Sequence, residues 1–265
     1  MSTPHGDLDC EHAVVATGYD LVPVIPDWPG REDFAGELIH ASAYRNAEPY
    51  RGRDVLVVGP GCSGTEIAYY LAVGGAGRVR LAVRSQPQLI LRVSRGIPAD
   101  ATGILATWAP AGIMDRLARV FRKLDIGDLA AYGLEVPEEG VVTWFRRRGL
   151  APTIIDTEVV DAIKDRRFEI VGAVERFERA RVILADGSAI EPEVVIAATG
   201  YERGLETLVG HLGVLGGDGR PSYVPPLTHP EAPGLHFVGY VPALGGNLRE
   251  VRLQARRLVR ALKRG

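Results

Sequence analysis

The segment DVLVVGPGCSGTEIAYYLA, residues 54–72, has the residue types and spacing of a dinucleotide-binding turn. Residues 55–58 form a short apolar run rich in valine, which is typical of a strand buried on both faces. The run ends at the G-x-G-x-x-G pattern of residues 59–64, and a helical pattern follows with apolar side chains at Ile67, Ala68 and Leu71. A lone G-x-G-x-x-G is a weak signal, but a strand before it and a helix after it favour a dinucleotide site over a chance glycine turn.

Each glycine of this pattern has a separate physical role. Gly59 permits the tight turn, Gly61 lets the backbone approach a pyrophosphate, and Gly64 lets the helix pack close to the strand. The helix N-terminus offers free N–H groups and a partial positive charge to the phosphates.

The strand expected after this helix, GRVRLAVRS in residues 77–85, bears on which dinucleotide is bound. NAD sites place an acid at the end of this strand, where it accepts hydrogen bonds from the ribose 2′-OH, but this strand ends in Arg84 and Ser85. An arginine there suits the 2′-phosphate of NADP, which it can bind by charge-assisted hydrogen bonds. The sequence therefore favours NADP. The alternative is that Arg84 is an ordinary solvent-facing residue at a strand end.

The string A-T-G-Y occurs twice, each time after a short apolar strand. The first copy places Thr17, Gly18 and Tyr19 after a strand expected at residues 13–16. The second places Thr199 and Gly200 after a strand expected at residues 194–198. We interpret the two copies as the points where the chain crosses between two related units.

Residues 96–140, between these copies, have a largely helical pattern that Pro110 divides into two helices. The apolar positions of this pattern are expected to form core, with a membrane face as the less favoured alternative: Ile104, Leu105, Trp108, Ile113, Leu117, Val120, Phe121 and Leu124. The pattern of residues 165–195 then predicts a series of short strands separated by turns such as Asp186-Gly187.

A last strand, expected at residues 235–238, leads through a glycine-rich loop into a C-terminal helix. Asn247 is expected to cap this helix, with Glu250 in a capping-box relation. Its expected apolar face comprises Leu248, Val251, Ala255, Leu258 and Leu262. The helix is either a simple terminal packing element or, as the pair Gly245-Gly246 favours, one whose N-terminus contacts a ligand.

The bulk composition excludes several classes of protein. The chain has 265 residues, 46% of them hydrophobic, and a formal net charge of -2, which gives no nucleic-acid footprint. Its two cysteines, Cys10 and Cys62, form no CxxC and no metal-binding spacing, so no metal site and a reduced, cytoplasmic location are expected. No apolar run reaches the ~18 residues of a membrane span. The basic runs at residues 146–148 and 252–264 are interpreted as solvated faces.

The segment FAGELIHASAYRN, residues 34–46, resembles the F-x-G-x-x-x-H identifying motif of class B flavoprotein monooxygenases. The motif positions are Phe34, Gly36, His40 and Tyr44, and the Tyr-Arg pair resembles the flavin-containing monooxygenase branch. The order of the motifs along the chain is similar to that family, and residues 128–140 look closest to its YUCCA-like members.

This resemblance implies an α/β fold of the two-dinucleotide-binding-domain flavoprotein type, with a Rossmann-like NADP-binding domain inserted in an FAD-binding domain. It implies a partial FAD-binding domain and linker at residues 1–48, and an NADP-binding domain with a helical insertion at residues 49–193. Residues 194–265 would be the C-terminal part of the FAD-binding domain. The implied activity is that of an NADPH-dependent flavoprotein monooxygenase. It would use FAD and O₂ to oxygenate a small molecule at nitrogen or sulfur, or to decarboxylate a 2-oxo acid oxidatively.

The resemblance also implies roles for particular residues. The residues expected at the NADP pyrophosphate are Gly59, Gly61, Cys62, Ser63, Gly64 and Thr65, with Arg84 and Ser85 at the 2′-phosphate. The residues expected at the junction of the domains are Thr17, Gly18, Tyr19, Thr199 and Gly200. Leu244, Gly245 and Gly246 would approach the flavin ring, and His40 and Tyr44 would shape the linker near NADP. No residue is singled out as catalytic.

Two departures from the family pattern stand out. Asparagine is usual where this chain has Cys62, and a thiol hydrogen-bonds much more weakly to a cofactor than an amide does. The chain also has no second G-x-G-x-x-G that could hold FAD. We therefore expect an N-terminally truncated chain that is inactive alone and that self-associates or needs a complementing N-terminal half. The competing hypotheses are a stand-alone NADP-binding module or sensor and, less favoured because CxxC is missing, a relative of the disulfide reductases.

Overall fold

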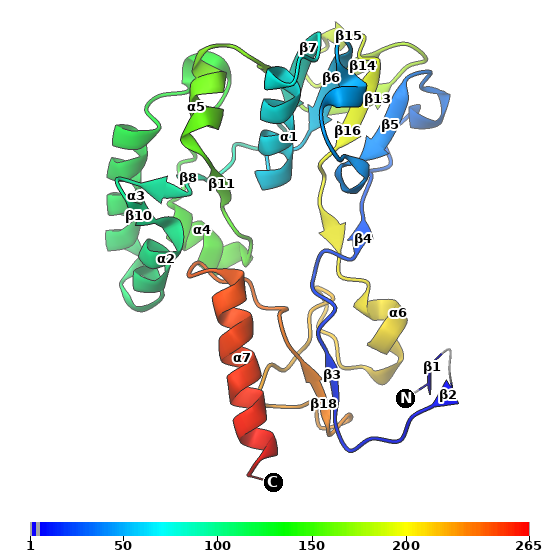
Figure 1. Ribbon diagram of the computed structural model, residues 1–265, viewed down its shortest axis with the longest axis vertical. Helices are drawn as coiled ribbons and strands as arrows, with labels where there is room; N and C mark the ends of the chain where they lie inside the picture. The colour runs from blue at the N-terminus through cyan, green and yellow to red at the C-terminus, as the bar shows by residue number, and fades with distance from the viewer. Residues whose placement is uncertain (1, 4–5, 265) are drawn as a thin grey trace. The chain divides into compact units, whose positions relative to one another are not determined.

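The structure is a computed structural model that describes residues 2–3 and 6–264. The chain forms two compact units: unit 1 comprises Met1–Val22 and Tyr201–Gly265, and unit 2 comprises Pro23–Gly200 (Figure 1). The chain therefore passes between the units after Val22 and again after Gly200. The second A-T-G-Y copy lies at one of these crossings, and the first lies shortly before the other.

A five-stranded sheet forms the centre of unit 2, in the order β12-β7-β6-β16-β5, and all of its neighbouring strands are parallel. Its strands are β5 (Glu37–His40), β6 (Asp54–Val58), β7 (Arg78–Ala82), β12 (Glu169–Val171) and β16 (Val194–Ala197). The strand of the glycine-rich motif, β6, lies in the middle, as a strand buried on both faces must.

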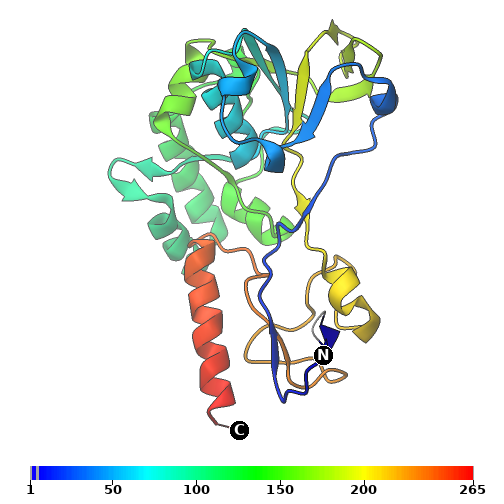
Figure 2. The same ribbon diagram turned by 45° about the vertical axis from the view of Figure 1, so that its right-hand side comes forward.

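Strand β6 alternates its side chains between two hydrophobic cores. Val55 and Val57 belong to the core that helix α1 (Cys62–Val73) covers, and the α1 residues in it are those of the sequence pattern, Ile67, Ala68 and Leu71. Leu56 and Val58 belong to a second core, beneath an antiparallel meander. The meander comprises β13 (Val174–Phe177), β14 (Val182–Leu184) and β15 (Ala189–Ile190). Figure 2 shows the helix and the meander on opposite sides of the sheet.

One buried charge in this sheet is not evident from the strand pattern. Arg80 of β7 has a side chain only 5% exposed, and its Nη1 donates to Oδ1 of Asp54 on β6 at 2.5 Å. The neighbouring strand thus supplies the carboxylate that a buried guanidinium requires.

The segment between β7 and β12 is mainly helical. It contains the helices α2 (Ala99–Trp108), α3 (Ala111–Asp125), α4 (Val141–Arg148) and α5 (Thr157–Lys164). It also contains the parallel pair β8 (Leu89–Leu91) and β11 (Thr153–Ile155), and the hairpin β9 (Val93–Ser94) and β10 (Ile97–Pro98). The predicted break at Pro110 is confirmed, because Pro110 separates α2 from α3.

The prediction that the apolar face of this helical segment forms core is wrong. Trp108 is 86% exposed, and the other exposed members of that face are Leu105, Ile113, Leu117, Val120, Phe121 and Leu124. Helix α3 buries Met114 and Asp115 instead. The Asp115 carboxylate accepts hydrogen bonds from Val142 N at 2.7 Å and from Thr143 Oγ1 at 2.5 Å, so it caps the N-terminus of α4. This long-range cap decides which face of α3 turns inward.

Unit 1 is built around the parallel pair β3 (Ala13–Val15) and β18 (Leu235–Phe237). Its core comprises Leu205, Val209, Val214, Phe237 and Tyr240. Unit 1 also contains β1 (Ser2–Thr3), β2 (Gly6–Asp7), β17 (Tyr201–Glu202), α6 (Leu205–Val209), the 3-10 helix η5 (Gly210–Leu212) and α7 (Asn247–Leu262), and β4 (Val22–Pro23) lies at the unit boundary. Within the part of the chain that the structure describes, no helix is long and apolar enough to cross a membrane.

The predicted cap of the C-terminal helix is also wrong. Gly246, at φ 90°, is the N-cap of α7, so the helix already includes Asn247. Glycine adopts this φ without strain, which lets the chain turn one residue earlier than the capping pattern suggests. On the predicted apolar face Leu258 is buried, whereas Leu248 is 87% exposed.

Candidate nucleotide-binding site

The carboxyl ends of four strands meet at one edge of the unit 2 sheet. Val58 of β6 is the register partner of both Ala82 of β7 and Ala197 of β16, and Ala197 is also the partner of His40 at the end of β5. The residues predicted to contact the nucleotide follow these strand ends directly. In an open parallel sheet, ligands bind beside the carboxyl edge at the point where the strand order reverses. In this sheet that point lies between β6 and β16.

Packing and backbone conformation require glycine at two of the three motif positions but not at the third. Gly59 has φ 114°, and a Cβ built there would lie 2.4 Å from the carbonyl oxygen of Ala198. A Cβ at Gly64 would lie 1.8 Å from the carbonyl oxygen of Gly59. Gly61, by contrast, has the ordinary extended values φ -72° and ψ 176°, and a Cβ there would meet nothing within 4 Å. The fold itself thus requires Gly59 and Gly64, whereas Gly61 borders open space that suits a ligand.

Helix α1 begins directly at this open space. Gly61 is its N-cap, and the first-turn amides of Cys62, Ser63 and Gly64 have no carbonyl partner within the helix. Such a terminus binds anions. Thr65 is buried, and its hydroxyl lies 3.0 Å from the carbonyl oxygens of both Gly61 and Cys62. It therefore braces the loop, and a direct nucleotide contact by Thr65 stays a prediction.

Arg84 and Ser85 are both exposed and follow the end of β7, the strand next to β6. Arg84 thus lies at the same sheet edge as the glycine-rich loop and is accessible to solvent. This is the place that a 2′-phosphate contact requires.

The F-x-G-x-x-x-H motif spans strand β5, so its members lie at opposite ends of that strand. Phe34 packs its ring 5.2 Å from that of Phe177, and a Cβ at Gly36 would lie 2.6 Å from the Phe34 ring. These two residues anchor the beginning of β5 in the core. Tyr44 stacks on Tyr50 with ring centroids 5.8 Å apart, and burial raises the pKa of the Tyr44 hydroxyl.

His40, at the carboxyl end of β5, joins the motif to the second A-T-G-Y copy. The backbone N–H of Ser42 donates to its Nδ1 at 3.1 Å, so its other ring nitrogen, Nε2, carries the proton. Nε2 then donates to the carbonyl oxygen of Gly200 at 3.0 Å. Thr199 is tied down as well, because its hydroxyl donates to the carbonyl oxygen of Val24. His40 thus orders the sheet edge where the chain leaves unit 2.

A second group of predicted residues comes together inside unit 1. Asn247 donates from its side-chain amide to the hydroxyl of Tyr19, and its Oδ1 accepts from Ala243 N at 3.2 Å. The hydroxyls of Thr17 and Tyr240 lie 2.7 Å apart in a hydrogen bond. The Asn247–Tyr19 bond connects the first A-T-G-Y copy to the loop of residues 243–247, which includes the predicted flavin-side residues Leu244, Gly245 and Gly246.

Comparison with known proteins decides the family, because residues 8–265 match the family described as flavin-binding monooxygenase-like. The chain belongs to this family. It is 33% identical over 211 residues to a probable indole-3-pyruvate monooxygenase, YUCCA7 of Arabidopsis thaliana, in an alignment covering 77% of this chain and 48% of the relative. It is 32% identical over 229 residues to the indole-3-pyruvate monooxygenase YUCCA1 of Oryza sativa subsp. japonica, covering 86% of this chain and 56% of the relative. The chain thus spans about half the length of the curated relatives it matches.

Solved structures agree at the level of the fold. A double mutant of a flavin monooxygenase from Stenotrophomonas maltophilia superposes with a TM-score of 0.62 at 20% identity, covering 94% of this chain and 62% of that one. The prediction of an α/β fold of the two-dinucleotide-binding flavoprotein type, as in the flavin-binding monooxygenases, is confirmed.

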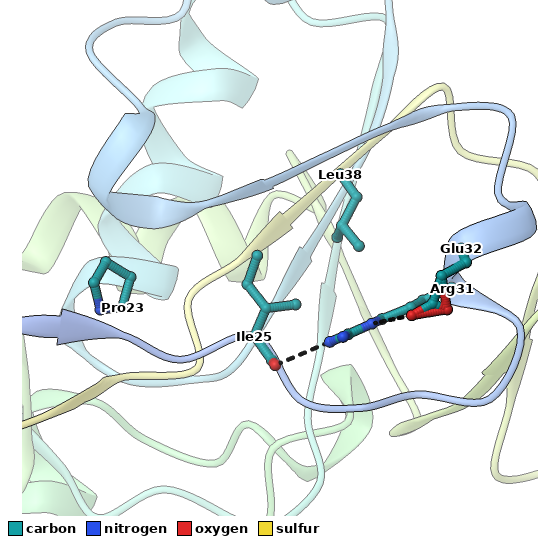
Figure 3. A pocket seen from close by; sticks show the side chains of 5 residues that line it. All are labelled: Pro23, Ile25, Arg31, Glu32 and Leu38. Atoms are coloured by element: carbon teal, nitrogen blue, oxygen red, sulfur yellow. Dashed lines mark hydrogen bonds and ion pairs between the residues drawn. The ribbon is translucent and has the colours of Figure 1, made fainter.

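Unit 2 of this chain also has a pocket of about 480 Å³. It is lined by Pro23, Ile25, Arg31, Glu32 and Leu38 (Figure 3). Arg31 donates from Nη1 to the carbonyl oxygens of Ile25 at 3.2 Å and Pro26 at 2.9 Å. The guanidinium is thus used to fasten the proline-rich connector, and we assign the pocket no chemistry.

Sequence reasoning missed one group of residues that touches the glycine-rich loop. Residues 152–154, at and before β11, contact the loop through Thr153, Ile154 and Pro152. No local pattern in the sequence marks them, because Thr153 is separated from its loop partner Pro60 by 93 residues.

Proposed function

We propose that this chain supplies the NADPH-binding part of a flavin-dependent monooxygenase. The proposal rests on one observation: three features lie at the same sheet edge. They are the open space beside Gly61, the N-terminus of α1 and the exposed Arg84. This combination offers free amides to a pyrophosphate and a cation to a 2′-phosphate.

In this proposal the loop amides and Gly61 hold the pyrophosphate. Arg84 and Ser85 bind the 2′-phosphate and select NADPH over NADH. His40 acts on the nucleotide only indirectly, because its imidazole holds the Gly200 carbonyl and thereby the strand ends that border the site.

FAD supplies the redox chemistry of such enzymes when it is bound. The residues of this chain fit only part of that cofactor. The loop of residues 244–246 would approach its flavin ring, and Thr17, Gly18 and Tyr19 would lie at the junction of the domains. The sequence, however, has one strand–G-x-G-x-x-G–helix unit and we assign it to NADPH. We therefore derive no reaction step through FAD in this chain.

We infer that the chain needs a complementing partner, because the β3–β18 sheet of unit 1 has only two strands among the described residues. β3 and β18 form a two-stranded parallel pair, an arrangement that is at best marginally stable without further strands. We propose that an FAD-binding half pairs with it in the active protein, and self-association is the alternative.

The proposed substrate is a 2-oxo acid that undergoes oxidative decarboxylation. This choice rests on the names of the matched relatives, which are indole-3-pyruvate monooxygenases. Oxygenation of a small molecule at nitrogen or sulfur is the other reaction that the family resemblance implies.

Nucleotide titration tests the proposal. Wild-type protein should bind NADPH roughly ten- to hundredfold more tightly than NADH, because a charge-assisted hydrogen bond to the 2′-phosphate contributes ~1.5–3 kcal/mol. Arg84→Ala should remove this preference and leave NADH binding unchanged. Equal affinity of the wild type for the two nucleotides would overturn the assignment of NADPH.

A further inference from the structure

The glycine-rich loop is held from outside by strand β11. Pro60, in the middle of the loop, has no amide hydrogen, so its carbonyl oxygen is its only backbone hydrogen-bonding group. That oxygen accepts a hydrogen bond from Oγ1 of Thr153 at 3.1 Å. Thr153 is only 9% exposed, and a hydroxyl buried there needs this partner.

Cys62 makes the second contact with the same strand. Its Sγ accepts a hydrogen bond from the backbone N–H of Ile154 at 3.3 Å and lies 3.9 Å from the carbonyl oxygen of Pro152, to which the thiol donates. The thiol that stands where the family usually has asparagine is thus engaged by β11. Three consecutive residues, 152–154, hold loop positions 60 and 62.

Strand β11 is itself firmly placed, which is necessary if it is to hold the loop. Thr153 N donates to the carbonyl oxygen of Gln88 at 2.9 Å, and β11 pairs with β8 in parallel. The guanidinium of Arg92, which follows β8, connects helix α1 to β11. It forms ion pairs of 2.8 Å with Glu66 on α1 and with Asp156, which follows β11. The β8–β11 pair is therefore fastened both to the loop and to the helix that the loop begins.

We propose that Thr153 and Cys62 are positioning residues that keep the glycine-rich loop in its pyrophosphate-binding conformation. This inference rests on the proposed function of the loop. Pyrophosphate is bound by backbone amides, whose directions depend on the orientation of the peptides that join residues 60, 61 and 62. Hydrogen bonds at the Pro60 carbonyl and the Cys62 side chain restrict that orientation, so less ordering remains to be done when the ligand binds.

The test compares two ligands in three threonine variants by calorimetric titration. NADP⁺ has the pyrophosphate, whereas 2′-AMP has the 2′-phosphate but no pyrophosphate. Thr153→Val should weaken NADP⁺ binding about three- to tenfold and leave 2′-AMP binding unchanged. Thr153→Ser should restore NADP⁺ binding, because it keeps the hydroxyl. Thr102→Val is the matched control, since the Thr102 hydroxyl also donates to a backbone carbonyl, that of Ala99 at 2.8 Å, but in helix α2.

Cys62→Ala provides a second variant in case Thr153→Val fails to fold, because Cys62 is exposed. It should also weaken NADP⁺ binding selectively. Unchanged NADP⁺ affinity in the folded variants, or an equal loss for NADP⁺ and 2′-AMP, would overturn the inference.

Hydrogen exchange separates this inference from the proposed function. If the wild type binds neither NADP⁺ nor 2′-AMP, the proposed function fails, but the hydrogen-bonded amides of Gly59 and Thr65 still report on the loop. Faster exchange of these amides in Thr153→Val than in Thr102→Val supports a positioning role. Equal exchange in the two variants contradicts it.

Discussion

Gly64 lies so close to Gly59 that a side chain has no room between them. A Cβ at Gly64 would be 1.8 Å from the Gly59 carbonyl oxygen and 3.2 Å from the Ala198 side chain. The first turn of α1 therefore packs directly against the end of β6 and the neighbouring end of β16. This close approach places the helix N-terminus at the sheet edge where a phosphate would bind.

Gly64→Ala should therefore destabilise the fold. The added methyl group would push α1 away from the backbone of the turn, and overpacking of this kind typically costs ~1–3 kcal/mol. The free energy of unfolding, measured by urea titration followed by circular dichroism, gives the result. A Gly64→Ala protein as stable as the wild type would show that the helix and the turn are less tightly packed than the structure describes.

Gly61→Val should leave the fold intact but abolish NADPH binding. The backbone of Gly61 is extended, and a Cβ there meets nothing within 4 Å, so the protein should fold normally. The side chain would fill the space proposed for the pyrophosphate, so NADPH binding should be lost. Calorimetric titration beside the circular dichroism spectrum measures both. Normal NADPH affinity in folded Gly61→Val protein would mean that the loop is not used for binding.

His236 should make the stability of unit 1 depend on pH. It is 4% exposed, its Nε2 is hydrogen-bonded to Nδ1 of His12 at 3.2 Å, and no partner of its Nδ1 is found within the described residues. Burial, and secondarily His12, lower the pKa of His236 below its ordinary value of 6.5. The unfolded chain thus takes up a proton at higher pH than the folded chain, so the free energy of unfolding should fall as pH drops below 6.5 and level off below the folded pKa.

Urea unfolding between about pH 8 and pH 5 tests this pH dependence. His236→Gln should have a smaller decrease in stability over this range than the wild type. His211→Gln is the control, because His211 is exposed and should leave the decrease as it is. Identical pH profiles for the wild type and His236→Gln would contradict the assignment to His236.

The chain on its own should purify without colour and without NADPH-dependent oxygen uptake. The reason is that its single strand–G-x-G-x-x-G–helix unit is assigned to NADPH, which leaves the FAD pyrophosphate with no loop of this kind. A visible absorption spectrum and an oxygen electrode are sufficient. A yellow preparation with about one FAD per chain and NADPH oxidase activity would show that this chain builds a flavin site in another way.

The sequence by itself determined the elements whose signals are local. The run of valines before residue 59, the glycine spacing and the apolar positions of α1 lie within about twenty residues of one another, and each reflects turn chemistry or side-chain periodicity. The family could likewise be recognised from Phe34, Gly36 and His40, because the motif is continuous in the chain. The break at Pro110 was predictable because proline cannot continue a helix.

Tertiary structure alone decided the features that depend on partners distant in sequence. The buried face of α3 is set by the Asp115 carboxylate, whose partners in α4 lie 27 and 28 residues further along the chain. Arg80 could be buried because β6 places Asp54 beside it. His40 is separated from the Gly200 carbonyl by 160 residues, and only the parallel pairing of β5 with β16 brings them together. Hydrophobic periodicity carries no information about such contacts, because it reports how a segment alternates along itself and not which polar group another segment will present to it.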